Sequence, residues 1–302
     1  MNISSNYGPS LAAEYENTSQ AMHYYCIVVS VLGMIGNITV IKAFFVADQI
    51  KKLMGPASIL IVSLAFLDFV ACLSMVPTMI FPAYFRSILN LPVICQLLSS
   101  TYIMWYAGGG SAWHMVAVAF DRYVAIAKPA WHRLNYSTNK VIIMCTASHL
   151  VGAVWPSYLA FFHVNIGDVC FYAIVLVNQY LKYFMLGDIL AIIIVPSICL
   201  VFFYGQIFFV LFKSNSSTAK KGQRNVVRTM FIVFLVYLVC WTPSILLYFL
   251  ASWNLNIIFF DITPDLLKIS VITVYLNSCL NPIIYPLSIR PFRKAMLPSF
   301  FT

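Results

Sequence analysis

The sequence predicts an all-α membrane protein, a bundle of seven transmembrane helices followed by a short amphipathic helix on the inner membrane surface. The 302 residues are 62% hydrophobic and only 9% charged, which is too little charge to cover a water-soluble domain of this length. The charged residues also gather in short clusters, which are separated by seven long and nearly uncharged runs. Both observations indicate that lipid surrounds most of the chain.

Each of the seven runs meets the length of about 20 apolar residues that a helix needs to cross the hydrocarbon of a bilayer. Asp68 interrupts the second run and Asp188 interrupts the fifth. A soluble helical protein is not expected to contain so many stretches of this length. The runs lie at residues 21–41, 53–85, 87–120, 141–167, 183–212, 229–260 and 269–289.

Lysine and arginine are distributed unequally between the loops that join these runs. They cluster after the first, third, fifth and seventh runs, whereas the other loops hold only Arg86, Lys182 and Lys268. Positive residues stay on the cytoplasmic side, so the N-terminus is predicted outside the cell and the C-terminus inside. The net charge of +9 is then a signal of topology, and we expect no nucleic-acid partner.

One membrane domain between two short tails is expected, in a multi-pass protein of the plasma membrane. Asn2 and Asn17 lie in Asn-x-Ser/Thr sequences of the outer tail and are expected to carry glycans. The segment 288–297 alternates cations with apolar residues, which predicts the amphipathic helix on the inner leaflet. The extracellular tail, the seven-helix domain and the cytoplasmic tail are predicted at residues 1–21, 22–287 and 288–302.

Motifs with proline or polar residues fall within or beside five of the apolar runs. In the seventh run Pro282 removes an intrahelical hydrogen bond, and polar side chains stand close to it in the sequence. The five motifs are "GN" (36–37), "SLAFLD" (63–68), "DRYVAIAKP" (121–129), "CWTP" (240–243) and "NSCLNPIIY" (277–285). In this order, and each on its own helix, they resemble the motifs of rhodopsin-like (class A) G-protein-coupled receptors. The resemblance covers residues 36–285.

This resemblance implies a receptor without catalytic activity, which transmits the binding of an extracellular ligand to a heterotrimeric G protein. Arrestin is expected as a further partner. Within the family the sequence is weakly similar to melatonin and peptide receptors, or to opsins. The residues that would couple the switch to the G protein are Asp121, Arg122, Tyr123, Tyr204 and Tyr285. The residues that would move as the toggle are Trp241, Pro243 and Pro282.

The resemblance also implies a pocket for sodium and water around the carboxylate of Asp68. A carboxylate near the middle of the membrane is costly unless it is wet, protonated or paired, and an anionic site rich in oxygen suits a hard cation. A hydrogen-bond network without an ion is the alternative. The expected sodium ligands are Asp68, Ser111, Asn277, Ser278 and Asn281. By the same resemblance, Cys95 and Cys170 match the family's disulfide, and both lie on the oxidising side.

The ligand is less well defined by the sequence. Tyr275 stands where opsins carry the lysine that binds retinal, so no covalent retinal cofactor is expected. Met104 stands where amine receptors carry an aspartate. Asp188 is the alternative hydrogen-bond acceptor or counter-charge for a ligand. The other interpretation of Asp188 is that its side chain faces the outer loop and pairs with Lys182. The expected cavity is apolar and aromatic, and it is lined by Met104, Trp105, Gly108, Asp188, Trp241, Ser244, Ile245, Tyr248, Val271 and Tyr275.

The sequence departs from the family at several places, two of which lie in the third and fourth helices. Cys95 and Arg122 lie 27 residues apart, about two more than the family norm, with "GGG" (108–110) between them. Either this helix bulges, or Cys95 lies further along the outer loop. His149 stands in the place of the usual tryptophan of the fourth helix. Two other function classes remain as alternatives: a receptor that binds retinal without a covalent link, and an ion transporter or channel.

Overall fold

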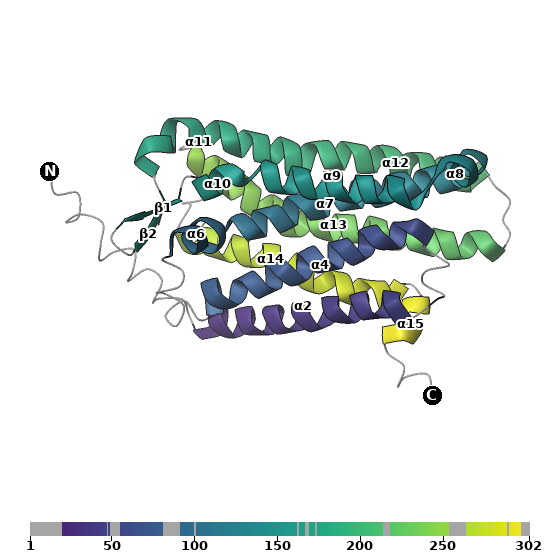
Figure 1. Cartoon of the computed structure of the whole chain (residues 1–302), viewed down its shortest axis with the longest axis horizontal. Coiled ribbons are helices and arrows are strands. Elements are labelled where there is room, and N and C mark those ends of the chain that lie inside the picture. The colour runs from purple at the N-terminus through teal and green to yellow at the C-terminus, as the bar shows by residue number, and fades with distance from the viewer. Residues whose placement is uncertain are drawn as a thin grey trace.

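The computed structural model describes residues 20–46, 48, 55–80, 91–99, 101–161, 163–166, 169–172, 174–213, 218–253, 264–288 and 290–296. Long helices run along one axis and enclose a common core (Figure 1). They are α2 (Gln20–Val46), α4 (Ser58–Met75), α7 (Tyr102–Ala127), α9 (Thr138–Val154), α12 (Val195–Lys213), α13 (Thr218–Ser252) and α14 (Pro264–Ser288). The predicted bundle of seven transmembrane helices is confirmed.

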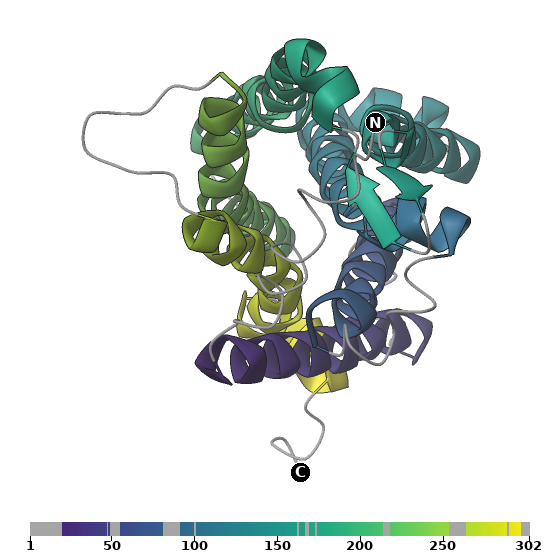
Figure 2. The ribbon, with the colours of Figure 1, turned by 90° about the vertical axis from the view of Figure 1, so that its left-hand side faces the viewer.

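Shorter elements extend or join these helices. α11 (Ile174–Asp188) continues through the π-helix η5 (Ile189–Ile194) into α12, and the strands β1 (His163–Ile166) and β2 (Val169–Tyr172) form an antiparallel hairpin. Figure 2 looks along the bundle from the end that carries this hairpin. The remaining short elements are η2 (Gly55–Ala57), η3 (Val76–Ile80), α6 (Pro92–Ile94), η4 (Cys95–Ser99), α8 (Pro129–Asn135), α10 (Ser157–Phe161) and α15 (Arg290–Met296).

The outer faces of the long helices are apolar, as contact with lipid requires. Among the described residues, five helical segments have the length and composition of membrane spans, and they cover Tyr24–Val46, Gly55–Met75, Thr138–Phe161, Tyr180–Leu211 and Arg224–Leu250. Large apolar side chains such as Ile143, Phe208 and Val239 are exposed on them. Such exposure is unfavourable in water but favourable in a bilayer.

The predicted amphipathic helix after the last span is confirmed as α15. Its Phe292 is buried against Phe44 of α2 and Tyr285 of α14, with ring centroids 5.2 and 5.4 Å away. Arg290 and Lys294 on the same helix are exposed. One apolar anchor and a basic outer face suit a helix that lies along the inner membrane surface.

The glycine run 108–110 does not form a bulge, because α7 is α-helical from Tyr102 onward. The helix is interrupted before its start, where Thr101 has a left-handed backbone with φ of 59°. Cys95 therefore lies on a separate segment, α6 and η4, and this accounts for the long spacing to Arg122. The second alternative is therefore correct: the helix does not bulge, and Cys95 lies further along the outer loop.

The glycines of this run allow neighbouring helices to approach α7 closely. A Cβ atom added to Gly152 of α9 would lie 2.6 Å from the backbone nitrogen of Gly110. A Cβ atom on Gly110 would lie 2.8 Å from Leu67 of α4. Distances below about 3 Å leave no room for a methyl group. The run therefore serves close packing of α7 between α4 and α9.

Candidate functional site

The carboxylate of Asp68 joins α4 to α14 in the interior of the bundle. Ser278 Oγ and Asn281 Nδ2 each donate a hydrogen bond of 2.8 Å, one to each carboxylate oxygen. Asn37 of α2 extends the contact, since its Nδ2 donates to the carbonyl of Ser278 at 2.9 Å. The buried acid is thus held by side chains close to Pro282. Polar groups are expected there, because a proline inside a membrane helix frees a backbone carbonyl that needs a partner.

The "GN" motif of the first run has a steric role at the same place. A Cβ atom on Gly36 would lie 2.7 Å from the ring of Pro282. Pro282 of α14 therefore packs against α2 at a position that carries no side chain. Gly36 allows α2 to approach Pro282 closely. Asn37 Nδ2 donates hydrogen bonds to the carbonyls of Ser278 and Gly33, so the two residues together hold α2 against this part of α14.

A small cavity adjoins Asp68 and reaches toward the outer half of the bundle. The space open to the centre of a water molecule is about 10 Å³, roughly what one water needs. Predicted sodium ligands and predicted ligand-binding residues line it together: Asp68, Ser111, Asn277 and Ser278 from the first group, and Met104, Gly108, Trp241 and Tyr275 from the second. Parts of the two predicted sites therefore adjoin one small cavity.

Oxygen atoms of two asparagines near Asp68 are available to a cation. Asn277 Oδ1 and Asn281 Oδ1 are buried and have no hydrogen-bond partner among the described residues. A buried acceptor without a donor is costly, and a hard cation or a water molecule would satisfy it. The residues present thus fit a sodium ion.

Trp241 lies at the centre of an aromatic cluster above the cavity. Its ring stacks on Tyr237 with centroids 5.8 Å apart and meets Trp105 edge-on at 5.7 Å. Trp105 also meets Tyr248 edge-on at 6.3 Å. A Cβ atom on Gly108 would lie 1.9 Å from the ring of Trp241, so only glycine allows the tryptophan this position. Ser244, one turn further along α13, is buried and its Oγ has no partner among the described residues.

Asp188 lies apart from this cavity. Its carboxylate accepts a hydrogen bond of 2.8 Å from Trp155 Nε1 and another from the Tyr158 hydroxyl, and it is fully buried. Lys182 does not pair with it, because Lys182 Nζ lies over the rings of Tyr183 and Trp253 at 5.1 and 5.3 Å. The acid therefore connects α11 to the end of α9 and to α10.

The π-helix η5 explains why this orientation differs from a simple helical projection. Each residue of a π-helix turns the chain through a smaller angle than a residue of an α-helix, since its hydrogen bonds run to the fifth residue instead of the fourth. Six residues of η5 separate Asp188 from Val195. Side chains before η5 therefore face a different direction from the one that an unbroken α-helix would give them.

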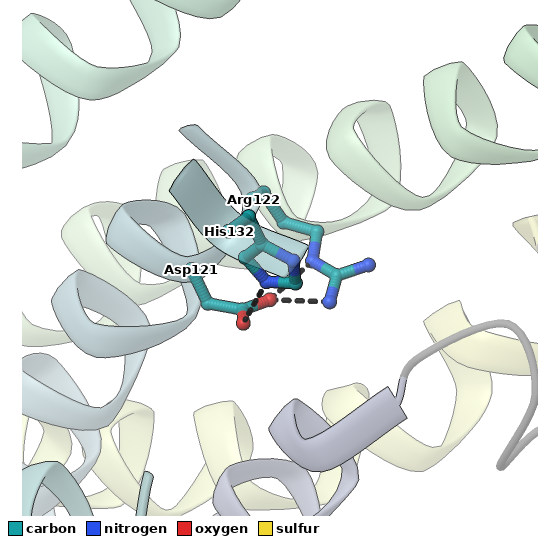
Figure 3. A network of polar contacts seen from close by, with 3 residues as sticks. All are labelled: Asp121, Arg122 and His132. Carbon is teal, nitrogen blue, oxygen red and sulfur yellow. Dashed lines mark hydrogen bonds and ion pairs between the residues drawn. The ribbon is translucent and has the colours of Figure 1, made fainter. Parts of the chain in front are cut away.

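At the other end of α7, Arg122 contacts its neighbour Asp121. Arg122 Nε donates a hydrogen bond of 2.6 Å to Asp121 Oδ2, and the same oxygen forms an ion pair with the guanidinium. His132 of α8 brings its Nε2 to 3.7 Å from Asp121 Oδ1 (Figure 3). Two of the predicted switch residues, Asp121 and Arg122, are therefore joined by an ion pair.

His132 and Tyr136 are neighbours of Asp121 that sequence reasoning missed. Their rings stack with centroids 4.4 Å apart. Burial, and then the Asp121 carboxylate, raise the pKa of the Tyr136 hydroxyl above its ordinary value, so this hydroxyl stays protonated. The contact of His132 with Asp121 had only a weak signal in the sequence. A histidine ten residues after Arg122 indicates such a contact only when α8 is known to fold back toward α7.

The other predicted switch residues lie near the inner end of the bundle. Tyr123 packs beside Phe203 of α12 at 5.7 Å, and Tyr204 meets Phe231 of α13 edge-on at 5.4 Å. The hydroxyls of Tyr204 and Tyr285 are buried and have no partner among the described residues. Neither hydroxyl is bonded to Arg122 in this arrangement. Pro243 and Pro282 lie inside the helices α13 and α14.

Two further predicted features fall partly outside the described residues. Cys95 forms a disulfide, whereas the side chain of Cys170, its predicted partner, lies outside the described part. Cys170 belongs to β2, where its backbone is opposite Asn165. Asn2 and Asn17 also lie outside the described residues.

Comparison with known proteins places the chain among membrane receptors. Residues 36–285 match the family described as "7 transmembrane receptor (rhodopsin family)". The chain is 25% identical to melatonin receptor type 1B-B of Danio rerio over 282 residues, which cover 89% of this chain and 78% of that protein. It is 25% identical to trace amine-associated receptor 1 of Homo sapiens over 317 residues, covering 95% and 89%. A rhodopsin of Cataglyphis bombycina is 34% identical over 108 residues, covering 35% and 28%.

Proposed function

Because this chain belongs to the rhodopsin family of seven-transmembrane receptors and is a G-protein-coupled receptor, we propose that its ligand is an amphipathic small molecule or a peptide that acts on Trp241. Binding of an extracellular ligand and coupling to a G protein follow from the family, and the chain is not an enzyme. The chemistry of the ligand and the path of the signal are the proposal.

The shared cavity is the observation that carries this proposal. Trp241, Met104 and Tyr275 line the same small space as Asp68. A ligand that displaces the ring of Trp241 changes the shape of that space, and therefore the contacts of Asp68 with Ser278 and Asn281. Since Asn281 precedes Pro282, the change reaches the kink of α14. A two-state bundle whose equilibrium the ligand shifts responds in this way.

The polar groups of the outer half favour a ligand without an obligatory positive charge. Met104 offers no carboxylate, and both oxygens of Asp188 already accept hydrogen bonds from Trp155 and Tyr158. A cationic ligand would have to compete with these two donors. An uncharged amphipathic ligand or an apolar part of a peptide instead fits the aromatic surface of Trp105, Trp241 and Tyr248.

Further parts of the proposal concern ions, partners and orientation. Sodium binds between Asp68, Ser111, Asn277, Ser278 and Asn281 in the resting state, where the free acceptors of Asn277 and Asn281 support it. No retinal is bound covalently, because Tyr275 holds the lysine position. The N-terminus lies outside the plasma membrane, as the cations of the loops indicate, and arrestin binds the activated receptor at its inner end.

The decisive experiment is a ligand screen on cells that express the full chain. Libraries of uncharged amphipathic molecules, peptides and primary amines are compared, with cAMP and calcium as readouts and Arg122→Ala as the uncoupled control. We expect responses to uncharged amphipaths or peptides that the control lacks. Responses to primary amines alone, abolished by Asp188→Asn, would refute the proposed ligand chemistry.

A further inference from the structure

A cluster of two histidines and a cysteine lies between α4, α7 and α9, away from the cavity described above. One nitrogen of His114, one nitrogen of His149 and the sulfur of Cys145 all lie within 4.8 Å of one another. Cys145 and His149 are four residues apart on α9, so they share one face of that helix. His114 faces them from α7, and Ser63 of α4 completes the group.

The direction of the hydrogen bonds leaves a lone pair of His114 facing this group. Gly110 O lies 2.7 Å from His114 Nδ1, and since a carbonyl can only accept, Nδ1 carries the proton. The neutral ring therefore presents the lone pair of Nε2. That atom lies 3.1 Å from Ser63 Oγ and 3.6 Å from Cys145 Sγ.

The ring of His149 converges on the same point. Its Nε2 lies 2.6 Å from Ser63 Oγ, the hydroxyl that also contacts His114 Nε2, and its Nδ1 lies 2.7 Å from the Tyr106 hydroxyl. The two imidazole rings meet edge-on with centroids 4.9 Å apart. Each histidine thus has one nitrogen directed at the shared space and the other held by a neighbour. Protein metal sites commonly fix their histidine ligands in this way.

We propose that His114, Cys145 and His149 bind one copper(I) ion in the membrane interior. Metal bonds of about 2.1 Å to nitrogen and 2.3 Å to sulfur, as measured for the similar d¹⁰ ion zinc, place the two ligand atoms about 3.6 Å apart at a tetrahedral angle. The observed distance from His114 Nε2 to Cys145 Sγ is 3.6 Å. Thiolate and imidazole are also the ligand types that soft ions select.

The charge of the site distinguishes copper(I) from zinc. One thiolate, two neutral imidazoles and a monovalent ion add up to zero charge. The same ligands around a divalent ion would leave one positive charge in the low-dielectric core of the bilayer, which is costly. Among the residues that the structure describes, no acidic side chain takes part in this cluster to offset that charge.

Binding requires one proton to leave and one to move. The thiol of Cys145 releases its proton to solvent as the copper–sulfur bond forms, and copper(I) keeps its oxidation state. The ring proton of His149 moves from Nε2 to Nδ1. Nε2 then binds the ion, and Nδ1 donates a hydrogen bond to the hydroxyl oxygen of Tyr106. The side chain of Ser63 moves aside or remains as a weak fourth ligand. Cys145 and His149 are only half-buried, so the site lies at the edge of the bundle, between its packed core and its lipid-facing surface.

Without an ion, the same residues form a continuous chain of hydrogen bonds. Since Nδ1 of His114 carries the proton, one consistent arrangement has Ser63 donating to His114 Nε2, His149 Nε2 donating to Ser63, and Tyr106 donating to His149 Nδ1. This chain joins the three helices equally well without metal. A direct measurement of bound metal distinguishes the copper site from the metal-free chain of hydrogen bonds.

The test uses the full receptor in lipid nanodiscs, loaded with copper(I) under anaerobic reducing conditions and then exposed to a copper chelator. Copper per receptor is measured by mass spectrometry, and X-ray absorption identifies the neighbouring atoms. We expect about one copper per receptor with one sulfur and two nitrogen neighbours. Cys145→Ser should lower the affinity more than about a hundredfold, and Tyr106→Phe about tenfold, since it removes an outer contact.

The matched control is Cys199→Ser, which replaces another free, half-buried cysteine on α12 and should keep the copper. Equal elution of all variants in size-exclusion chromatography verifies that they fold. If Cys145→Ser fails to fold, Tyr106→Phe and the absorption spectrum of the native chain decide. Loss of all copper from the native chain, or equal copper in Cys145→Ser, overturns the site. In a parallel sample loaded with copper(I) and zinc together, preferred retention of zinc overturns the choice of a monovalent ion.

Discussion

Asn281 donates a hydrogen bond of 2.8 Å to the carboxylate of Asp68, so the residue directly before the α14 proline is joined to the middle of α4. Ser278, one turn earlier, donates to the other oxygen of the same carboxylate. The kink of α14 and the charge of Asp68 are thus parts of one structure. These hydrogen bonds link an ion or proton bound by Asp68 to the segment of α14 around Pro282.

Sodium should stabilise the resting receptor through Asp68. At a sodium concentration about ten times its dissociation constant, the gain in unfolding free energy is about 1.4 kcal/mol. The midpoint of thermal unfolding in detergent should therefore rise with sodium but not with choline at equal ionic strength. Asp68→Asn should abolish the difference between the two salts. If the variant responds to sodium as the native receptor does, the ion binds elsewhere.

Asp188 should contribute to stability through Tyr158 and Trp155. In Asp188→Asn one acceptor oxygen becomes an amide donor, so either the buried Tyr158 hydroxyl or the part-buried Trp155 Nε1 loses its partner. The cost is up to about 1–3 kcal/mol. Tyr158→Phe removes one of these donors instead. The effects of the two substitutions should be less than additive when thermal unfolding is measured in a double-mutant cycle. Fully additive effects would show that the Tyr158 contact contributes no coupling energy.

Replacement of Gly152 by alanine should be far more damaging than a chemically identical change elsewhere. The new methyl group would meet backbone atoms of Gly110 and Tyr106 at 2.6 to 2.9 Å, and backbone cannot rotate away as a side chain can. We expect a loss of about 1–3 kcal/mol and low surface expression. Gly205→Ala on α12 meets nothing within 4 Å and should be neutral or stabilising, because alanine favours helix. Equal expression of the two variants would contradict the close packing of α7 and α9.

Arg122 should be required for coupling to the G protein and not for folding. His132 Nε2 remains 3.7 Å from Asp121 Oδ1 when the guanidinium is removed. Arg122→Ala should reach the cell surface in normal amount, while nucleotide exchange on the G protein falls by at least about tenfold, equivalent to about 1.4 kcal/mol. Arg290→Ala, which removes an exposed cation of α15, is the control. Normal exchange by Arg122→Ala would exclude the proposed role.

The sequence predicted well those features that depend on local pattern. The spans follow from apolar runs of sufficient length, and α15 follows from the alternation of cations with Phe292. The contact of Asp121 with Arg122 joins neighbours in the chain. The contacts of Asp68 with Ser278 and Asn281 were predicted as a group because the family motifs carry them, although more than 200 residues separate the partners.

Features that depend on helix phase or on close backbone contact were not predicted. Asp188 was expected in the ligand cavity, but its carboxylate contacts Trp155 and Tyr158, which are 33 and 30 residues away. The π-helix η5 changes the direction of its side chain, and no residue type in "ILAIII" indicates a π-helix. The glycines 108–110 indicate an interruption of the helix on propensity alone, yet here they allow close contact with Trp241, Leu67 and Gly152.

The π-helix η5 also affects how this receptor is compared with its relatives. A gapless alignment that proceeds outward from Pro196 assumes that both helices advance by the same angle per residue. Where a relative has a plain α-helix, positions before Ile189 would be assigned to the wrong partners, and Asp188 would be equated with residues that face another direction. Comparative pocket maps, and ligands designed from them, therefore need a one-residue offset in this half of the helix.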